Sequence, residues 1–203
     1  MNTKKIRSLL CVVLAALTLL LSACSKDDGG SSQSEEVLLP ISINGKEIRV
    51  GETTVQTLLD EGLNVSLVNE NYERVTVDPD TELEANAYYT GCSIKMTDNM
   101  SFSVSLATDD EAVPLGQAVI ARMELNMAAE DDKSVLGAIS FDGVPVTELT
   151  REMAGEKYPD WSGDENMWLH YGLEYRYSLV FNNATGNLIS FTVERSYDVD
   201  WNS

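Results

Sequence analysis

The sequence predicts an α+β fold made of two tandem modules, each a short helix packed on an antiparallel sheet. Three observations support this prediction. Tight-turn signals lie between short apolar runs at Asn44-Gly45 and at Asp142-Gly143, and such dipeptides are typical of β-hairpins. A segment with helical spacing of apolar residues follows each turn, and runs that alternate apolar and polar residues complete each half. Short helices beside half-buried antiparallel strands indicate the α+β class.

The first two dozen residues predict export from the cytoplasm. Three basic residues, Lys4, Lys5 and Arg7, precede an apolar run over residues 9–21 that only Thr18 interrupts. That run is too short for a stable transmembrane helix, which needs about 20 apolar residues. A basic start, a short apolar core and small residues after it are typical of a signal peptide, here residues 1–23.

The signal peptide ends in Leu21-Ser22-Ala23-Cys24, which resembles the lipobox of bacterial lipoproteins. The resemblance implies that the Cys24 thiol receives a diacylglycerol and that cleavage occurs before this residue. The mature protein would then be anchored in the cell membrane by its lipid and face outside the cytoplasm. The alternative is an ordinary signal peptide that contains a cysteine. Residues 24–36 carry glycine, serine and charge but no large apolar side chain, which predicts a flexible tether.

Charge and cysteine content restrict the partners. The chain of 203 residues has a formal net charge of −19, which becomes −22 when Lys4, Lys5 and Arg7 leave with the signal peptide. Such a surface repels nucleic acid and anionic head groups, so no nucleic-acid partner is expected, whereas a cationic peptide would be attracted. Cys92 is the one cysteine that remains after Cys11 is removed and Cys24 is lipidated, so no intramolecular disulfide is expected. It precedes an alternating run, which favours a buried, unreactive thiol.

The first module is predicted over residues 37–130. The segment "ISINGKEIRV" predicts a hairpin, and Thr53 or Thr54 can cap a following helix that Gly62 ends. The runs "SFSVSLA" and "AVIARMELNM" alternate as strands do. In the second run, the side chains predicted to share the buried side are Ala121, Met123, Leu125 and Met127.

The second module is predicted over residues 131–203. Here Thr147 can cap a helix that ends at Gly155, before Tyr158-Pro159. The segments "LEYRYSLVF" and "LISFTVE" alternate on either side of "NNATGN", which predicts a long hairpin. In the first of these strands, the side chains predicted to share one face are Leu173, Tyr175, Tyr177, Leu179 and Phe181.

The order of these features resembles a group of small bacterial lipoproteins, mostly from Gram-positive bacteria, that have no established activity. The resemblance rests on "ISINGKEIRVGETTVQTLLDEGL" and on a Phe-Asn-x-x-x-Gly-x-Leu-x-x-Phe hairpin within residues 171–193. The second half is also similar to the repeat of the beta-lactamase-inhibitor-like fold in outer-membrane lipoproteins of the small-protein-A type. The opening segment further resembles ubiquitin-like sulfur carriers. Those carriers need a terminal Gly-Gly, and this chain ends in "DVDWNS", so only a β-grasp shape for the first half stays open.

No catalytic or metal motif is complete in the sequence. The single histidine, His170, lies at the end of a predicted strand, and no Gly-x-Ser-x-Gly motif accompanies it, so a structural role is expected. One histidine and one free cysteine cannot fill a closed zinc site, and no cofactor is expected. Asp78, Asp80 and Glu82 are weak calcium candidates, because their spacing does not match an EF-hand loop.

Aromatic residues in the connection after the second helix are the candidate partner-binding site. Tyr158, Trp161, Trp168 and Tyr171 lie within "YPDWSGDENMWLHY", and Tyr and Trp often dominate binding interfaces. The alternative is that most of these rings belong to the core. We therefore expect a non-enzymatic, lipid-anchored binding module for an envelope protein or a cationic peptide. The alternative function is a carboxylate-dependent envelope hydrolase of glycan or peptide.

Overall fold

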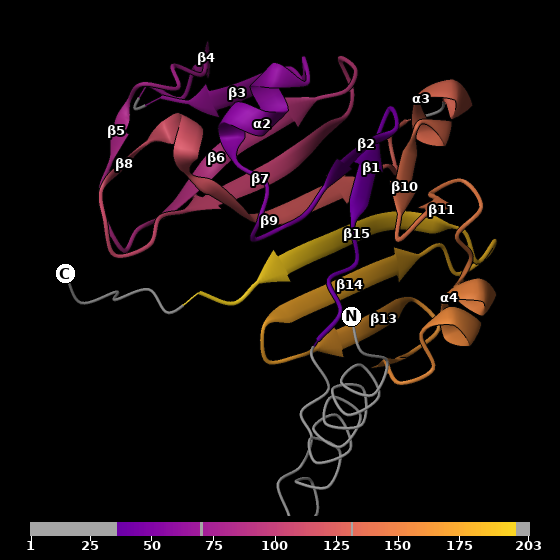
Figure 1. Cartoon of the computed structure of the whole chain (residues 1–203). Helices are drawn as coiled ribbons and strands as arrows, with labels where there is room; N and C mark the ends of the chain where they lie inside the picture. Colours follow the sequence, from indigo (N-terminus) through magenta and orange to yellow (C-terminus); the bar gives the residue numbers. More distant parts are fainter. Residues whose placement is uncertain (1–35, 70, 131, 198–203) are drawn as a thin grey trace, which may run out of the picture. The chain divides into compact units, whose positions relative to one another are not determined.

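Nine antiparallel strands form one sheet that runs through both halves of the chain (Figure 1). The structure, a computed structural model, describes residues 36–69, 71–130 and 132–197. Therefore the signal peptide, Cys24 and the predicted tether as far as residue 35 lie outside the described residues. In spatial order the strands are β12 (Ser162–Gly163), β13 (Met167–Tyr171), β14 (Tyr175–Phe181), β15 (Leu188–Arg195), β9 (Val119–Asn126), β7 (Ser101–Ala107), β6 (Tyr88–Lys95), β3 (Val65–Val68) and β4 (Arg74–Thr76).

A second, four-stranded sheet joins the opening hairpins of the two halves. Its order is β11 (Val144–Pro145), β10 (Ile139–Phe141), β1 (Ile41–Ile43) and β2 (Lys46–Ile48), and β5 (Glu82–Leu83) pairs separately with β8 (Val113–Pro114). The predicted turns are confirmed: Asn44 and Gly45 have φ of 53° and 77°, as a type I′ turn requires. The predicted turn at Asp142-Gly143 likewise joins β10 to β11.

Among the described residues, four short helices lie outside the sheets, namely α2 (Val55–Asp60), the 3-10 turn η1 (Leu115–Gln117), α3 (Lys133–Gly137) and α4 (Arg151–Lys157). The prediction for α2 is confirmed, because the Thr57 amide donates to Thr54 Oγ1 at 3.3 Å and Gly62 follows the helix with φ of 76°. A threonine hydroxyl at this position satisfies an amide that has no partner within the helix.

The predicted start and end of α4 are wrong. The cap is Thr150 instead of Thr147, and Gly155 lies inside the helix instead of ending it. The residues before Thr150 are used in a turn, in which the amides of Glu148 and Leu149 donate to the Pro145 carbonyl. The helix does end at Tyr158, before Pro159, as predicted.

The buried side chains of both sheets, together with those of α2 and η1, form one hydrophobic cluster. Phe141 of the small sheet packs on Phe191 of the large sheet, with ring centroids 5.6 Å apart. The alternation predicted for β9 is confirmed, because Ala121, Met123, Leu125 and Met127 are all buried. Leu173 was predicted to share the buried face of the strand that is now β14. It is instead 76% exposed, because it lies in the turn between β13 and β14, before that strand begins.

Strands from both halves of the chain pair within the same two sheets, so neither half has a large sheet of its own. Strand β9 pairs with β7 on one side and with β15 on the other, so the large sheet is continuous across the predicted boundary at residues 130/131. The fold is therefore mainly antiparallel β-sheet with few helices, and the prediction of two tandem modules is not confirmed. The β-grasp alternative for the first half is wrong, because β1 pairs only with β2 and with β10 in the part of the chain that the structure describes. No helix among the described residues has the length and apolar character needed to cross a bilayer.

Candidate functional site

Tyr158 belongs to the core and not to a binding surface. Its side chain is 7% exposed, and its ring stacks on Trp161 with centroids 4.4 Å apart. Its hydroxyl donates to Asp142 Oδ2 at 3.0 Å. Burial raises the pKa of the Tyr158 phenol far above its usual value, and the nearby Asp142 carboxylate adds to this increase. The prediction that Tyr158 contacts a partner is therefore wrong, because its ring is buried against Trp161 and its hydroxyl is bonded to Asp142.

The two tryptophans of the predicted site are half-buried and make packing contacts. Trp161 stacks on Tyr177 at 5.3 Å. Trp168 donates from Nε1 to the Tyr158 carbonyl at 3.2 Å, and the Arg151 guanidinium lies 3.8 Å from its ring centroid. Tyr171, by contrast, is 73% exposed. A role of Trp161, Trp168 and Tyr171 in partner binding stays a prediction, and both tryptophans have a packing role beside it.

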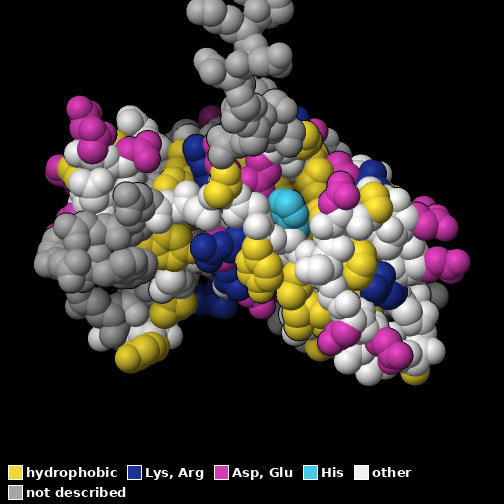
Figure 2. All heavy atoms as spheres, turned by 90° about the horizontal axis from the view of Figure 1, so that it is seen from below, with side chains coloured by type: hydrophobic (Ala, Val, Ile, Leu, Met, Phe, Trp, Pro, Cys, Tyr) yellow, Lys and Arg dark blue, Asp and Glu magenta, His cyan; other side chains and the backbone are white. Residues whose placement is uncertain are grey.

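His170 is held by Glu36, at the first described residue of the chain. His170 Nε2 lies 3.0 Å from Glu36 Oε1, and the amides of Glu174 and Tyr175 donate to the same carboxylate at 2.8 and 3.3 Å. Figure 2 shows this face, where hydrophobic and acidic side chains lie near the histidine. The structural role predicted for His170 is thus confirmed. The polar composition of residues 24–36 placed Glu36 in the tether, but its carboxylate is hydrogen-bonded to the β13–β14 hairpin.

We expect Gly172→Ala to lower the free energy of unfolding by about 1–3 kcal/mol, the cost of losing hydrogen bonds to a charged group. A Cβ at position 172 would overlap with Glu36 Oε1 and displace the carboxylate. Urea unfolding followed by circular dichroism measures this loss. Gly137→Ala is the matched control, because a Cβ there meets nothing within 4 Å. Equal stability of both variants would contradict a structural role for the Glu36 contact.

The acidic residues proposed for calcium do not form a site. Asp78 Oδ1 accepts the Asp80 amide at 3.2 Å and so stabilises the turn before β5. Within residues 36–69, 71–130 and 132–197, no three His, Cys, Asp or Glu side chains gather as metal ligands would. The calcium hypothesis for Asp78, Asp80 and Glu82 is therefore not supported.

Cys92 lies on β6 and is 3% exposed, which confirms the prediction of a buried thiol. Burial raises the pKa of the Cys92 thiol to about 11. The thiol is therefore protonated at neutral pH and is a poor nucleophile.

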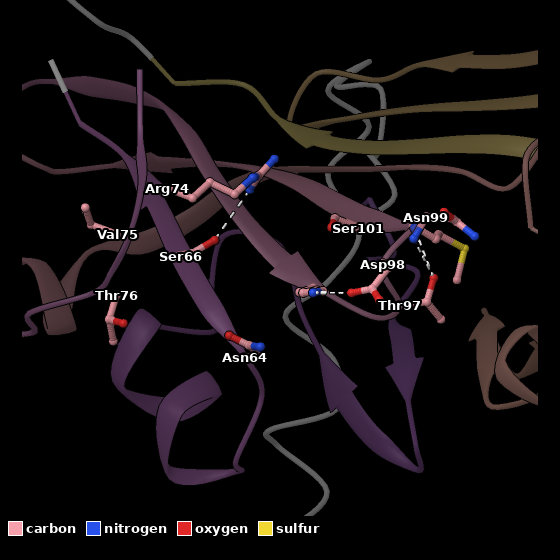
Figure 3. A pocket seen from close by; sticks show the side chains of 11 residues that line it. Asn64, Ser66, Arg74, Val75, Thr76, Thr97, Asp98, Asn99 and Ser101 are labelled. Carbon is pink, nitrogen blue, oxygen red and sulfur yellow. Dashed lines mark hydrogen bonds and ion pairs between the residues drawn. The ribbon is translucent and has the colours of Figure 1, made fainter. Parts of the chain in front are cut away.

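A polar cavity of about 670 Å³ lies between the β3–β4 hairpin and the turn that joins β6 to β7 (Figure 3). The register places Ser66 opposite both Thr76 and Ser93, so these three hydroxyls lie on the same face of the large sheet. Arg74 lies two residues before Thr76 and therefore on the same face. The other lining residues are Asn64, Val75, Lys95, Thr97, Asp98, Asn99, Met100 and Ser101.

Arg74 lies across β3 at the edge of this cavity (Figure 3). Its Nη1 donates to Ser66 Oγ at 3.4 Å and also to Ser93 Oγ. On the opposite wall, Lys95 Nζ lies 2.6 Å from Asp98 Oδ1. Sequence reasoning missed this cavity, because a single arginine in a three-residue strand has no recognisable pattern and its neighbours come from distant segments.

Comparisons of this chain with protein-family models, with curated proteins and with solved structures found no match.

Proposed function

We propose that this chain is a non-catalytic, lipid-anchored binding protein outside the cytoplasm, and that it holds a small polar molecule in the cavity beside Arg74. The cavity is the observation that supports this proposal. Its volume of about 670 Å³ lies in the range of small-molecule sites. Most such sites are apolar, whereas hydroxyl, amide and charged groups dominate this lining. A polar ligand would satisfy those groups, and an apolar ligand would leave them unpaired.

The membrane is the second partner in this proposal, through the lipid on Cys24. The lipobox-like end of the signal peptide supports it, and so does the resemblance to small bacterial lipoproteins. An envelope protein or a cationic peptide remains a further predicted partner for the acidic surface. The alternative function, a carboxylate-dependent hydrolase, gains no supporting contact among the described residues.

We also infer that the two halves are copies of one module, although they share their sheets. Each half has a tight hairpin, a threonine that caps a helix and a final long strand. Each capping threonine also forms a bridge to the start of its own last strand, Thr54 with Val119 and Thr150 with Asn187. The repeated bridge supports a common origin of the two helix–strand units.

Filling the cavity tests the binding proposal. Asn99 is exposed on the turn between β6 and β7, so Asn99→Trp should close the cavity at little cost in stability. The probes are glucose, glucuronate and glucosamine, which share a ring of hydroxyl groups and differ in charge. Saturation-transfer NMR on the whole mature protein in neutral detergent should show binding of at least one probe, and Asn99→Trp should abolish it.

Asn183→Trp is the matched control for this experiment, because Asn183 is exposed on the distant β14–β15 turn. This variant should bind as the unmodified protein does. If no probe binds, or if Asn99→Trp binds as well as the control, the cavity is not the ligand site.

A further inference from the structure

The cavity has the opposite charge sign to the rest of the chain. Its lining contains two cations, Arg74 and Lys95, and one carboxylate, Asp98, for a net charge of +1. The whole chain has a formal net charge of −19. Lys95 is already paired with Asp98, and the hydrogen bond from Lys95 lowers the pKa of that carboxyl. Arg74 forms no ion pair within the part of the chain that the structure describes.

The guanidinium of Arg74 is oriented but not neutralised. Ser66 and Ser93, its two hydrogen-bond partners, are uncharged, and both accept from Nη1. Among the described residues, Nε and Nη2 have no acceptor of their own. A guanidinium presents its N–H groups in a planar fork that matches the two oxygens of a carboxylate. Arg74 is exposed, and the two serines orient its guanidinium while its other N–H groups stay accessible to an acceptor from outside the chain.

The remaining lining suits a ligand that is rich in hydroxyl groups. Asn64, Thr76, Asn99 and Ser101 line the same cavity as Arg74 (Figure 3). Amides and hydroxyls both donate and accept hydrogen bonds, as the hydroxyl groups of a ligand do. None of these four side chains carries a charge, so they would contribute hydrogen bonds and leave charge recognition to Arg74.

We propose that the ligand is a small, hydroxyl-rich monoanion of the sugar-acid class, whose carboxylate binds Arg74. This inference rests on the proposed function and specifies its ligand. A single carboxylate beside Arg74 interacts mainly with that cation, because charges beyond about 8–10 Å are largely screened at physiological salt. A polyanion would instead extend over the acidic surface and be repelled. The class is therefore a monosaccharide acid and not an acidic polymer.

Substitution of Arg74 tests the proposal with glucuronate as the probe. Arg74→Gln removes the charge and should raise the dissociation constant for glucuronate about tenfold or more, as expected for loss of a hydrogen bond between charged groups. Arg74→Lys keeps the charge but loses the planar fork, so it should bind with intermediate affinity. Arg176→Gln is the matched control, because it removes one arginine charge at an exposed position on β14 that does not line the cavity, and its affinity for glucuronate should stay within about twofold of that of the unmodified protein.

Two further probes separate this inference from the proposed function. Glucose has the ring without the carboxylate, acetate has the carboxylate without the ring, and both should bind more weakly than glucuronate. Unfolding midpoints of the Arg74 variants check that each is folded. If glucose binds as tightly as glucuronate, or if Arg74→Gln leaves glucuronate binding unchanged, the charge assignment is wrong while the cavity keeps its binding function. If acetate equals glucuronate, the sugar-acid class is wrong.

Discussion

We expect Phe141→Ala to lower the free energy of unfolding by about 3–5 kcal/mol, as truncation of a buried aromatic ring does. Phe141 is 0% exposed and lies on β10, where the small sheet meets the large one. Its ring contacts Tyr158, Trp161 and Tyr177 at centroid distances of 6.1, 6.5 and 6.2 Å, and it also packs on Phe191. A domain is usually stable by only about 5–15 kcal/mol, so this loss would be a large fraction of the total.

Urea unfolding followed by far-UV circular dichroism measures this effect. Phe141→Leu keeps most of the buried surface and should cost less than the alanine variant. Tyr171→Ala is the control, because that ring is 73% exposed, and its free energy of unfolding should change by about 0.5 kcal/mol or less. A loss below about 1 kcal/mol for Phe141→Ala would mean that the aromatic cluster is not a central part of the core.

Local signals predicted the elements of this fold well. The turn at Asn44-Gly45 is correct because two adjacent residues with positive φ determine the turn type by themselves. The buried face of β9 is correct because alternation along one strand reports burial directly. The start of α4 was missed, because Thr147 and Thr150 are equally good caps and only the turn at Pro145 decides between them.

Non-local pairing could not be predicted from the same signals. The sequence of β9 shows that the strand is buried but does not show that β7 and β15 flank it. The pairing of Ile43 with Ile139 joins two hairpins that are separated by most of the first half. Each hairpin forms its turn and its internal strand pairing from its own sequence. Neither hairpin sequence therefore indicates that β1 will pair with β10.

The candidate site was the least predictable part for a similar reason. A tryptophan in a connection has the same local sequence whether it packs inward or contacts a partner, and Trp161 stacks on Tyr177. Glu36 was placed in the tether by its neighbours, although its carboxylate is bound by distant backbone amides. Arg74 became a candidate only when the fold placed uncharged hydroxyls beneath it.

We expect Cys24→Ser to abolish lipidation and membrane attachment completely. Only a thiol forms the thioether to diacylglycerol, and a serine hydroxyl is far less nucleophilic at neutral pH. The predicted diacylglycerol brings two acyl chains, and each buried methylene contributes about 0.8 kcal/mol of membrane affinity. One acyl chain binds a membrane only marginally, whereas two give durable attachment. The variant should therefore accumulate as unprocessed precursor without lipid.

Metabolic labelling with a clickable palmitate, followed by cell fractionation, measures this loss. Cys11→Ser is the matched control, because Cys11 lies inside the predicted signal peptide and is removed with it. This control should be lipidated, processed and recovered with the membrane, as the unmodified chain is. Because binding in the cavity does not depend on the anchor, a folded Cys24→Ser protein should still bind the same probes. Recovery of mature, lipid-free protein from cells that carry the unmodified sequence would show that residues 1–23 are an ordinary signal peptide and that Cys24 is not an anchor.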